Sequence, residues 1–246
     1  MKIDIRDIRT QWINLEKDTT KAEQMVTLLN ERGFKNHERF AAMCEDTEFG
    51  ITKDNCNPPG TPCPSNGMSI GLDHGGDLLG LQCPGFGTHM CGLSHRKLLN
   101  ETIVSDGKPI FVLEDDVEIE NDNIKYEIEI PDDVDAVYLG TSQGDCNYSA
   151  ISVNEDIAKV QRIFATHAII HFNPEYSKRV IQLTEDAVKG DGPFDVGIAY
   201  NIQKDFNVYA VKTPYFYQAD SKNTVNKYEY ITRIPLLLND EESNLV

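Results

Sequence analysis

One segment of the chain reads Ile110-Phe111-Val112-Leu113-Glu114-Asp115-Asp116, in which four apolar residues lead directly into three acidic ones. Pro109 precedes it, and its aromatic and β-branched residues predict a buried strand. A strand buried on both faces is typical of a parallel α/β sheet, in which ligands bind outside the carboxyl ends of the strands. The segment therefore predicts a ligand site at its acidic end.

Three neighbouring carboxylates repel one another unless a cation lies among them. Hard divalent cations prefer oxygen ligands and often bridge a carboxylate to a substrate phosphate. We therefore expect a site for a metal ion and a diphosphate at residues 114–116. A solvated acidic turn is the alternative interpretation, since short acidic clusters are common.

The composition allows a single large domain. The chain has 246 residues, of which 40% are hydrophobic, enough to bury a sizeable core. It carries 23 basic and 40 acidic residues, which gives a net charge of −17. Such a surface repels phosphate backbones and argues against tight non-specific nucleic-acid binding, although a local basic groove is compatible with it.

No stretch has the length of a transmembrane span, and Met1–Asp7 alternates charge with Ile and lacks the apolar core of a signal peptide. A cytoplasmic location is therefore expected. In that compartment the six cysteines are expected to be free thiols. A zinc site is disfavoured, because no two cysteines have the short separation of ordinary zinc knuckles.

The N-terminal part predicts a strand followed by a helix. Trp12–Leu15 is the expected strand, and Asp18 is the expected N-cap of a helix over Thr19–Arg32. Gly33 ends this helix, whose apolar face comprises Ala22, Met25, Val26 and Leu29. A strand followed by a helix is the usual opening of an α/β domain.

Residues 45–90 change character, because Pro, Gly and Cys replace the apolar periodicity. We expect an irregular insertion across the active-site side of the domain, with a disordered linker as the alternative. A helix is predicted over Ser94–Asn100, with His95 near its start.

The remaining chain alternates between strands and helices. A helix starts at Asn173-Pro174, and residues 117–133 are expected to be irregular or to lie at a sheet edge. The acidic tail, 236–246, is expected to be frayed, and residues 1–246 are expected to form one domain. Three further strands are expected, at Ala136–Gly140, Ile163–Ile170 and Val208–Val211.

Six separated blocks together resemble glycosyltransferase family 25, which includes bacterial lipooligosaccharide transferases and the collagen galactosyltransferase domain. The likeness covers most of residues 12–220, excluding much of 45–87, and the chain departs from the family at Met90, where Gly is usual. The blocks are Ile13-Asn14-Leu15-Glu16-Lys17-Asp18, Cys91-Gly92-Leu93-Ser94-His95, Leu113-Glu114-Asp115-Asp116, Tyr138-Leu139-Gly140, Thr166-His167-Ala168 and Phe194-Asp195-Val196-Gly197.

The resemblance implies a GT-A-like fold, with a Rossmann-like, mixed and mainly parallel sheet flanked by helices. It also implies a metal-dependent, inverting glycosyltransferase that moves a sugar from a nucleotide-sugar donor to a hydroxyl acceptor, expected to be a glycan. The implied cofactor is a divalent cation, manganese or alternatively magnesium. The unmatched insertion leaves the identity of the acceptor open.

The resemblance assigns roles to the acidic residues. Asp116 is the expected metal ligand together with Glu114, since the two have the spacing of an Asp-x-Asp motif. Glu114 or Asp115 would hold the ribose of the nucleotide or a metal-bound water. Asp195 is the expected catalytic base, because an inverting transferase needs a group that accepts the proton of the acceptor hydroxyl. The alternative role of Asp195 is that of a helix N-cap.

Further residues are expected to bind the donor. Asn14 and Lys17 would contact the nucleotide, although Lys17 also suits an ordinary surface position. Ser94 and His95, at a helix start, would meet a phosphate or else cap that helix. His167 lies in an apolar strand, where a core histidine is the alternative to a partner for metal or phosphate.

Other functions compete with transfer to a glycan. Some phage-type transferases glycosylate hydroxylated bases in DNA, which the net charge of −17 disfavours. A degenerate relative that only binds sugars or proteins is disfavoured by the intact Glu114-Asp115-Asp116. A metal enzyme that hydrolyses phosphates or nucleotides would explain the acids but not the other five blocks.

Overall fold

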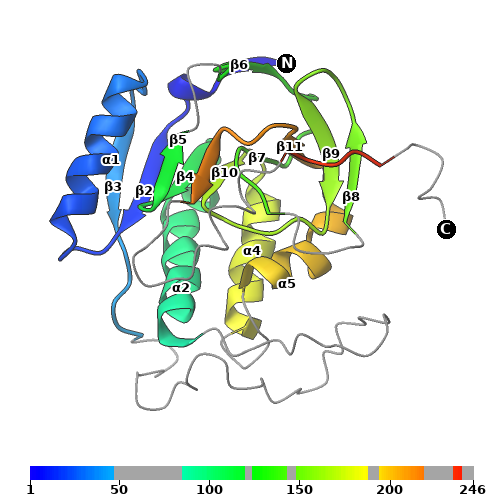
Figure 1. Ribbon diagram of the computed structural model, residues 1–246. Coiled ribbons are helices and arrows are strands. Elements are labelled where there is room, and N and C mark those ends of the chain that lie inside the picture. The colour runs from blue at the N-terminus through cyan, green and yellow to red at the C-terminus, as the bar shows by residue number, and fades with distance from the viewer. Residues whose placement is uncertain (47–84, 120–123, 143–147, 188–193, 219–234, 240–246) are drawn as a thin grey trace.

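An eight-stranded sheet with helices on both faces forms the body of the protein (Figure 1). The computed structural model describes residues 1–46, 85–119, 124–142, 148–187, 194–218 and 235–239. From one edge of the sheet to the other, the strands are β3 (His37–Ala41), β2 (Thr10–Asn14), β4 (Ile110–Glu114), β10 (Ala168–His171), β7 (Ala136–Tyr138), β11 (Val208–Val211), β9 (Ile157–Gln161) and β8 (Ser149–Ser152).

The sheet is mixed. Strands β3, β2 and β4 are parallel to one another, and so are β7 and β11. Strand β10 lies between β4 and β7 and is antiparallel to both, while β9 is antiparallel to its neighbours β11 and β8. The chain is therefore an α/β protein, as expected, and the acidic segment belongs to the parallel part of its sheet.

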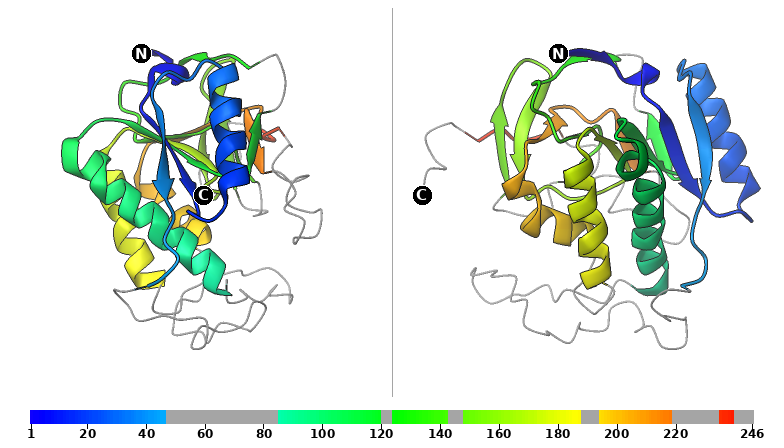
Figure 2. Two further views of the ribbon diagram at one scale, coloured as in Figure 1. Left: turned by 90° about the vertical axis from the view of Figure 1, so that its left-hand side faces the viewer. Right: turned by 180° about the vertical axis from the view of Figure 1, so that it is seen from behind.

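Helices cover the two faces of the sheet unequally (Figure 2). One face carries α1 (Thr19–Glu31), and the other carries α2 (Gly85–Glu101), α3 (Ile103–Asp106), α4 (Pro174–Ala187) and α5 (Phe194–Asn201). Two small antiparallel sheets pair β1 (Lys2–Asp4) with β6 (Glu127–Glu129) and β5 (Val117–Ile119) with β12 (Phe216–Gln218). The 3-10 helices are η1 (Ile5–Asp7) and η2 (Gln203–Asp205).

Strand β4 is buried on both faces, which confirms the prediction from its apolar run. Ile110 and Val112 pack into the core beneath α2 and α4, whereas Phe111 and Leu113 pack into the core beneath α1. All four side chains are fully buried. Because successive side chains of a strand point to opposite faces, the same alternation directs the acidic residues that follow.

Helix α1 follows the local signals of its sequence. The Asp18 carboxylate accepts the backbone N–H of Lys21 at 3.3 Å, and Gly33 adopts the left-handed conformation, with φ of 79°, just after the helix. Met25 and Leu29 are buried as expected. Val26 is not part of the buried face, since 40% of it is exposed. The packed stripe is thus narrower than the apolar pattern suggested.

The expected start of α2 was wrong. The helix begins at Gly85, so residues 85–90 of the expected irregular insertion are helical, and Ser94 and His95 lie inside the helix. The glycines at 85 and 87 hide the helical period in the sequence, while buried Met90, Leu98 and Leu99 hold the helix on the sheet. The rest of the expected insertion, 47–84, lies outside the described residues.

The segment before β10 also differs from the prediction. Strand β10 begins only at Ala168, whereas residues 163–170 were expected to be extended. Arg162 and Ala165 have positive φ values of 60° and 79°, and a left-handed residue interrupts a strand. His167 therefore lies immediately before the strand rather than inside it.

The second expected helix and the C-terminal segment are both anchored by backbone contacts. Asn173 Oδ1 accepts the N–H of Glu175 at 2.8 Å, which confirms the expected helix start. Near the C-terminus, Leu236 is buried and Asn239 accepts the N–H of Ala150 at 2.6 Å, so this part of the expected frayed tail packs on the body. Residues 240–246 lie outside the described part of the chain.

Among the described residues, no helix combines the length and apolar character that crossing a membrane requires.

A substitution at Gly140 tests the packing beside the acidic segment. A Cβ atom at this position would collide with His167 Nε2 and with the carbonyl oxygen of Phe216. We expect Gly140→Ala to lower the free energy of unfolding by about 1–3 kcal/mol, measured by denaturant titration. The control is Gly87→Ala in α2, where a Cβ meets no atom within 4 Å and no loss is expected. Equal stability of the two variants would show that this contact is not tight.

Candidate functional site

The three acids lie at the carboxyl end of β4, beside the carboxyl end of β2 (Figure 1). Ile13 of β2 is the register partner of Glu114 in this parallel pair. From β2 the chain continues through α1 to β3, at one edge of the sheet. From β4 the next strand of the same sheet is β7, which lies in the direction of the opposite edge. Such a point of divergence is where open α/β sheets bind ligands.

Asp115 is held by two partners from the α1 side. Its Oδ1 lies 2.8 Å from Lys21 Nζ, and its Oδ2 accepts a hydrogen bond from Asn14 Nδ2 at 2.7 Å. Burial disfavours the charged form of Lys21, but the hydrogen bond and the charge of Asp115 outweigh it and raise the lysine pKa. Lys17, the lysine expected at the nucleotide, has an exposed side chain. The lysine that reaches the acids is Lys21, in the first turn of α1.

Glu114 points to the α2 side and is heavily hydrogen-bonded. Its Oε1 lies 2.8 Å from Thr166 Oγ1, 3.1 Å from His95 Nε2 and 3.8 Å from Cys91 Sγ. Burial alone would raise the pKa of this carboxyl, but the hydrogen bond and charge of His95, with help from His167 and Thr166, lower it to about 2. Glu114 is therefore ionised at neutral pH.

Asp116 is the acid whose negative charge is least compensated by its surroundings. Its Oδ1 is buried and has no hydrogen-bond partner among the described residues. Burial, followed by the charges of Glu114 and Asp115, raises its pKa to about 7, although Lys21 acts in the opposite direction. A carboxylate in this position gains from any cation that reaches it.

His167 is fully buried and structurally anchored. Its backbone oxygen accepts the N–H of Glu114 at 3.0 Å, and its Nε2 lies 3.2 Å from the carbonyl oxygen of Phe216. Burial lowers its pKa, so the ring is neutral and Nε2 is the nitrogen that donates to the carbonyl. Nδ1 is then an acceptor, and it has no partner among the described residues. The two backbone contacts agree with a core histidine. The unpartnered Nδ1 could still accept a hydrogen bond from a ligand.

Asp195 joins the site from the first turn of α5. Its Oδ2 accepts the N–H of Ala165 at 3.3 Å, and burial, reinforced by the charge of Glu114, raises its pKa against the opposing effect of the hydrogen bonds. The ring of the preceding residue, Phe194, packs on His95 with a centroid distance of 5.1 Å. The alternative role of Asp195 was that of a helix N-cap. Helix α5 begins one residue earlier, at Phe194, so Asp195 lies within the helix and not before it.

Ser94 has a structural position. Its Oγ donates to the carbonyl oxygen of Met90 at 2.7 Å and accepts the N–H of Met43 at 2.8 Å. It therefore joins α2 to the chain that leaves β3. The expectation that Ser94 and His95 stand at a helix N-terminus was wrong, because α2 begins at Gly85 and its first backbone N–H groups lie elsewhere.

The described residues offer two different sets of metal ligands. Asp116 and Asp115 provide oxygen atoms only. On the α2 side of β4, the ligand atoms of Cys91, His95 and Glu114 all lie within 4.8 Å of one another. Sequence reasoning missed the contributions of Cys91, Thr166 and Lys21. Cys91 and His95 are four residues apart. With the correct helix start, this spacing would have placed both on one helix face.

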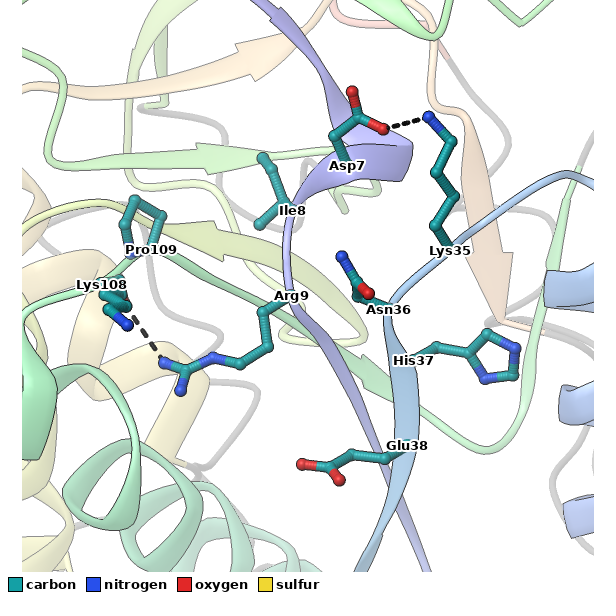
Figure 3. A pocket seen from close by; sticks show the side chains of 9 residues that line it. All are labelled: Asp7, Ile8, Arg9, Lys35, Asn36, His37, Glu38, Lys108 and Pro109. Carbon is teal, nitrogen blue, oxygen red and sulfur yellow. Dashed lines mark hydrogen bonds and ion pairs between the residues drawn. The ribbon is translucent and has the colours of Figure 1, made fainter.

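A hollow of about 880 Å³ lies at the other end of the same strands (Figure 3). It is lined by residues just before β2, β3 and β4, including Arg9, Lys35 and Lys108. Its charges are largely matched, since Lys35 pairs with Asp7 at 2.6 Å and Arg9 pairs with Asp106 at 2.8 Å. Because ligands of such sheets bind at the carboxyl ends of the strands, we place the candidate site at the acids and not in this hollow.

Comparison with known proteins adds no family assignment. No protein-family model matches the chain, and no curated protein matches it.

The raised pKa of Asp116 predicts a pH-dependent loss of stability. The folded protein favours the protonated form of Asp116. The free energy of unfolding is therefore highest below the ordinary pKa of 3.8 and falls as pH rises through about 7. In chelator, Asp116→Asn should match wild type near pH 4 and exceed its free energy of unfolding by roughly 1–4 kcal/mol near pH 8. Asp205→Asn, at an exposed position, is the control. A pH-independent difference between Asp116→Asn and wild type would refute this assignment.

Proposed function

We propose that the protein is a divalent-cation-dependent glycosyltransferase that moves a sugar from a nucleotide-sugar donor to a hydroxyl acceptor. The observation that carries the proposal is the buried Oδ1 of Asp116, which has no partner among the described residues and is acted on by the charges of Glu114 and Asp115, at the point where β2 and β4 diverge. An uncompensated anionic cluster of this kind suits a cation that arrives with an anionic ligand. The six family-like blocks of the sequence support a sugar nucleotide as that ligand.

The residues present fit a hard cation such as manganese or magnesium. Asp116 would hold it, because its Oδ1 has no partner among the described residues. Both oxygens of Asp115 are already bound by Asn14 and Lys21. Glu114 was expected to share this ion, but its Oε1 already receives hydrogen bonds from the α2 side. When bound, the ion would supply Lewis-acid stabilisation of the leaving diphosphate.

The side of β2 and α1 suits the nucleotide. Asn14 Oδ1 is buried and has no partner among the described residues, so it can accept a hydrogen bond from a donor group. Lys21 Nζ, half-buried against Asp115, provides a positive charge for a phosphate. Donor contacts of His95 and His167 remain predictions, and the most direct candidate is the bare Nδ1 of His167.

Asp195 suits the role of the base. A general base functions best when its pKa is close to the working pH, and burial raises the pKa of this carboxyl in that direction. Its Oδ2 is steadied by the N–H of Ala165. In the transfer step, Asp195 would accept the proton of the acceptor hydroxyl while that oxygen forms the new glycosidic bond and the diphosphate leaves.

A glycan remains the proposed acceptor. The net charge of −17 disfavours the alternative of hydroxylated bases in DNA. Asp116 Oδ1 is buried and has no partner among the described residues, which lowers stability. This favours a catalytic protein, because a relative without a catalytic role would gain nothing from such a group.

Loss of Asp116 should abolish cation-dependent donor binding. We expect wild type to gain melting temperature in a panel of nucleoside diphosphates and sugar nucleotides only when manganese is present. Asp116→Asn should lose this gain while staying folded, because it preserves the shape of the side chain. Glu23→Gln serves as the control, since Glu23 is an exposed carboxylate of α1. A cation-dependent gain that persists in Asp116→Asn would overturn the proposed site.

Loss of Asp195 should affect transfer and not donor binding. Asp195→Asn can still accept the Ala165 N–H but cannot accept a proton, so transfer should fall by roughly 10²–10⁴-fold. The donor-induced shift in melting temperature should stay at the wild-type value. The measurement is transfer from the sugar nucleotide that the panel identifies. Turnover close to wild type would show that the base is a different residue.

A further inference from the structure

We propose that Cys91, His95 and Glu114 form a separate binding site for a borderline-soft divalent cation of the zinc class. This site lies on the α2 side of β4, whereas Asp115 is held on the α1 side by Asn14 and Lys21. The inference goes beyond the proposed function and does not depend on it, because it concerns metal binding by the free protein.

The three ligands converge from two elements. Cys91 and His95 are four residues apart on α2, so their side chains lie on one face of the helix. Glu114 ends β4 and points toward that face. Its Oε1 lies 3.1 Å from His95 Nε2 and 3.8 Å from Cys91 Sγ, and all three ligand atoms lie within 4.8 Å of one another.

These separations are close to those that a tetrahedral zinc ion requires. Zinc binds sulfur at about 2.3 Å, imidazole nitrogen at about 2.0–2.1 Å and carboxylate oxygen at about 2.0–2.2 Å, which sets neighbouring ligand atoms about 3.3–3.6 Å apart. The two measured pairs differ from this range by a few tenths of an ångström. The third pair, Cys91 and His95, lies within 4.8 Å, so these two side chains of α2 rotate toward a shared ion when it binds.

The chemistry of the ligands selects the class of metal. Sulfur and imidazole ligands suit zinc or cobalt, whereas magnesium and manganese prefer oxygen. Three protein ligands leave a tetrahedral ion one open position. A site with one cysteine, one histidine and one glutamate needs no close pair of cysteines, so the wide cysteine spacing of the chain is compatible with zinc here.

The surroundings support a cation at this place. Burial and then the charges of Glu114, Asp116 and Asp195 raise the pKa of the Cys91 thiol, and the same negative charges attract a cation. Thr166 donates to Glu114 Oε1, the kind of hydrogen bond that orients a metal-binding carboxylate. Phe194 packs on His95 and limits its motion. The competing explanation is a purely hydrogen-bonded cluster in which His95 and Cys91 donate to Glu114.

Cobalt provides a direct probe, because a cobalt–thiolate bond gives a charge-transfer band in the near ultraviolet. The full chain is titrated with Co²⁺ and Zn²⁺ in the absence of nucleotide. Since the chain has six cysteines, the key variant replaces the other five, Cys44, Cys56, Cys63, Cys83 and Cys146, with serine and keeps Cys91. We expect this variant, once shown to be folded by circular dichroism, to develop the band.

Two further variants test the ligand set in the wild-type background. Cys91→Ser and His95→Gln should each weaken zinc binding at Cys91 by at least about 100-fold, since even loss of a residue that only orients a ligand costs 10–100-fold. Cys44→Ser, at an exposed position, should leave the affinity unchanged. The inference is overturned if the Cys91-only variant shows no band, or if Cys91→Ser retains the full band and affinity. Neither result bears on the site at Asp116, which is tested with manganese and nucleotide.

Discussion

The burial of β4 on both faces is the constraint on which the candidate site depends. Four apolar side chains alternate between the two cores and fix the register and direction of the strand. The acidic side chains that follow continue to point to alternate faces of the sheet. Glu114 turns toward α2 and Asp115 turns toward α1, so neighbouring carboxylates meet different partners. Without the buried run, nothing would separate three adjacent acids into distinct surroundings.

The surroundings compensate the negative charges unequally. Glu114 is stabilised as an anion by His95 and Thr166, and its pKa falls to about 2. Asp115 has an ion pair with Lys21. For Asp116, burial and the charge of Glu114 outweigh the opposing charge of Lys21, and its pKa rises to about 7. Natural proteins retain destabilising groups of this kind mainly where function requires them, which is why Asp116 carries the functional argument and its better-satisfied neighbours do not.

The sequence predicted those parts of the fold that local signals determine. The apolar run of β4, the Asp18 cap of α1 and the Asn173 start of α4 all belong to this class. The start of α2 was missed because glycines obscure its period and its stability comes from packing against distant strands. The position of His167 was missed because the left-handed residue before it is an alanine, which gives no sequence signal.

For the site, sequence reasoning identified the acids but not all of their partners. Lys21 and Asp115 are separated by 94 residues, and Thr166 and Glu114 by 52, so no local pattern links them. Only the sheet order brings them together, since β2, β4 and β10 are neighbours in space and not in sequence. The family-like blocks pointed to several of these segments without showing which side chain in each segment makes the contact.

The position of Glu114 relates the two metal sites to each other. Its charge is second only to burial in raising the pKa of Asp116, so the two carboxyl groups interact electrostatically. A dication bound to the Cys91 thiolate, neutral His95 and the Glu114 carboxylate would be neutralised by its ligands, with the thiol proton released, so the negative charge of Glu114 would no longer help to attract a cation to Asp116. Such coupling is reciprocal, because each ion changes the affinity for the other by the same factor. A zinc-class ion at Cys91, His95 and Glu114 would therefore weaken the binding of a second cation at Asp116, through the electrostatic interaction between the two carboxyl groups.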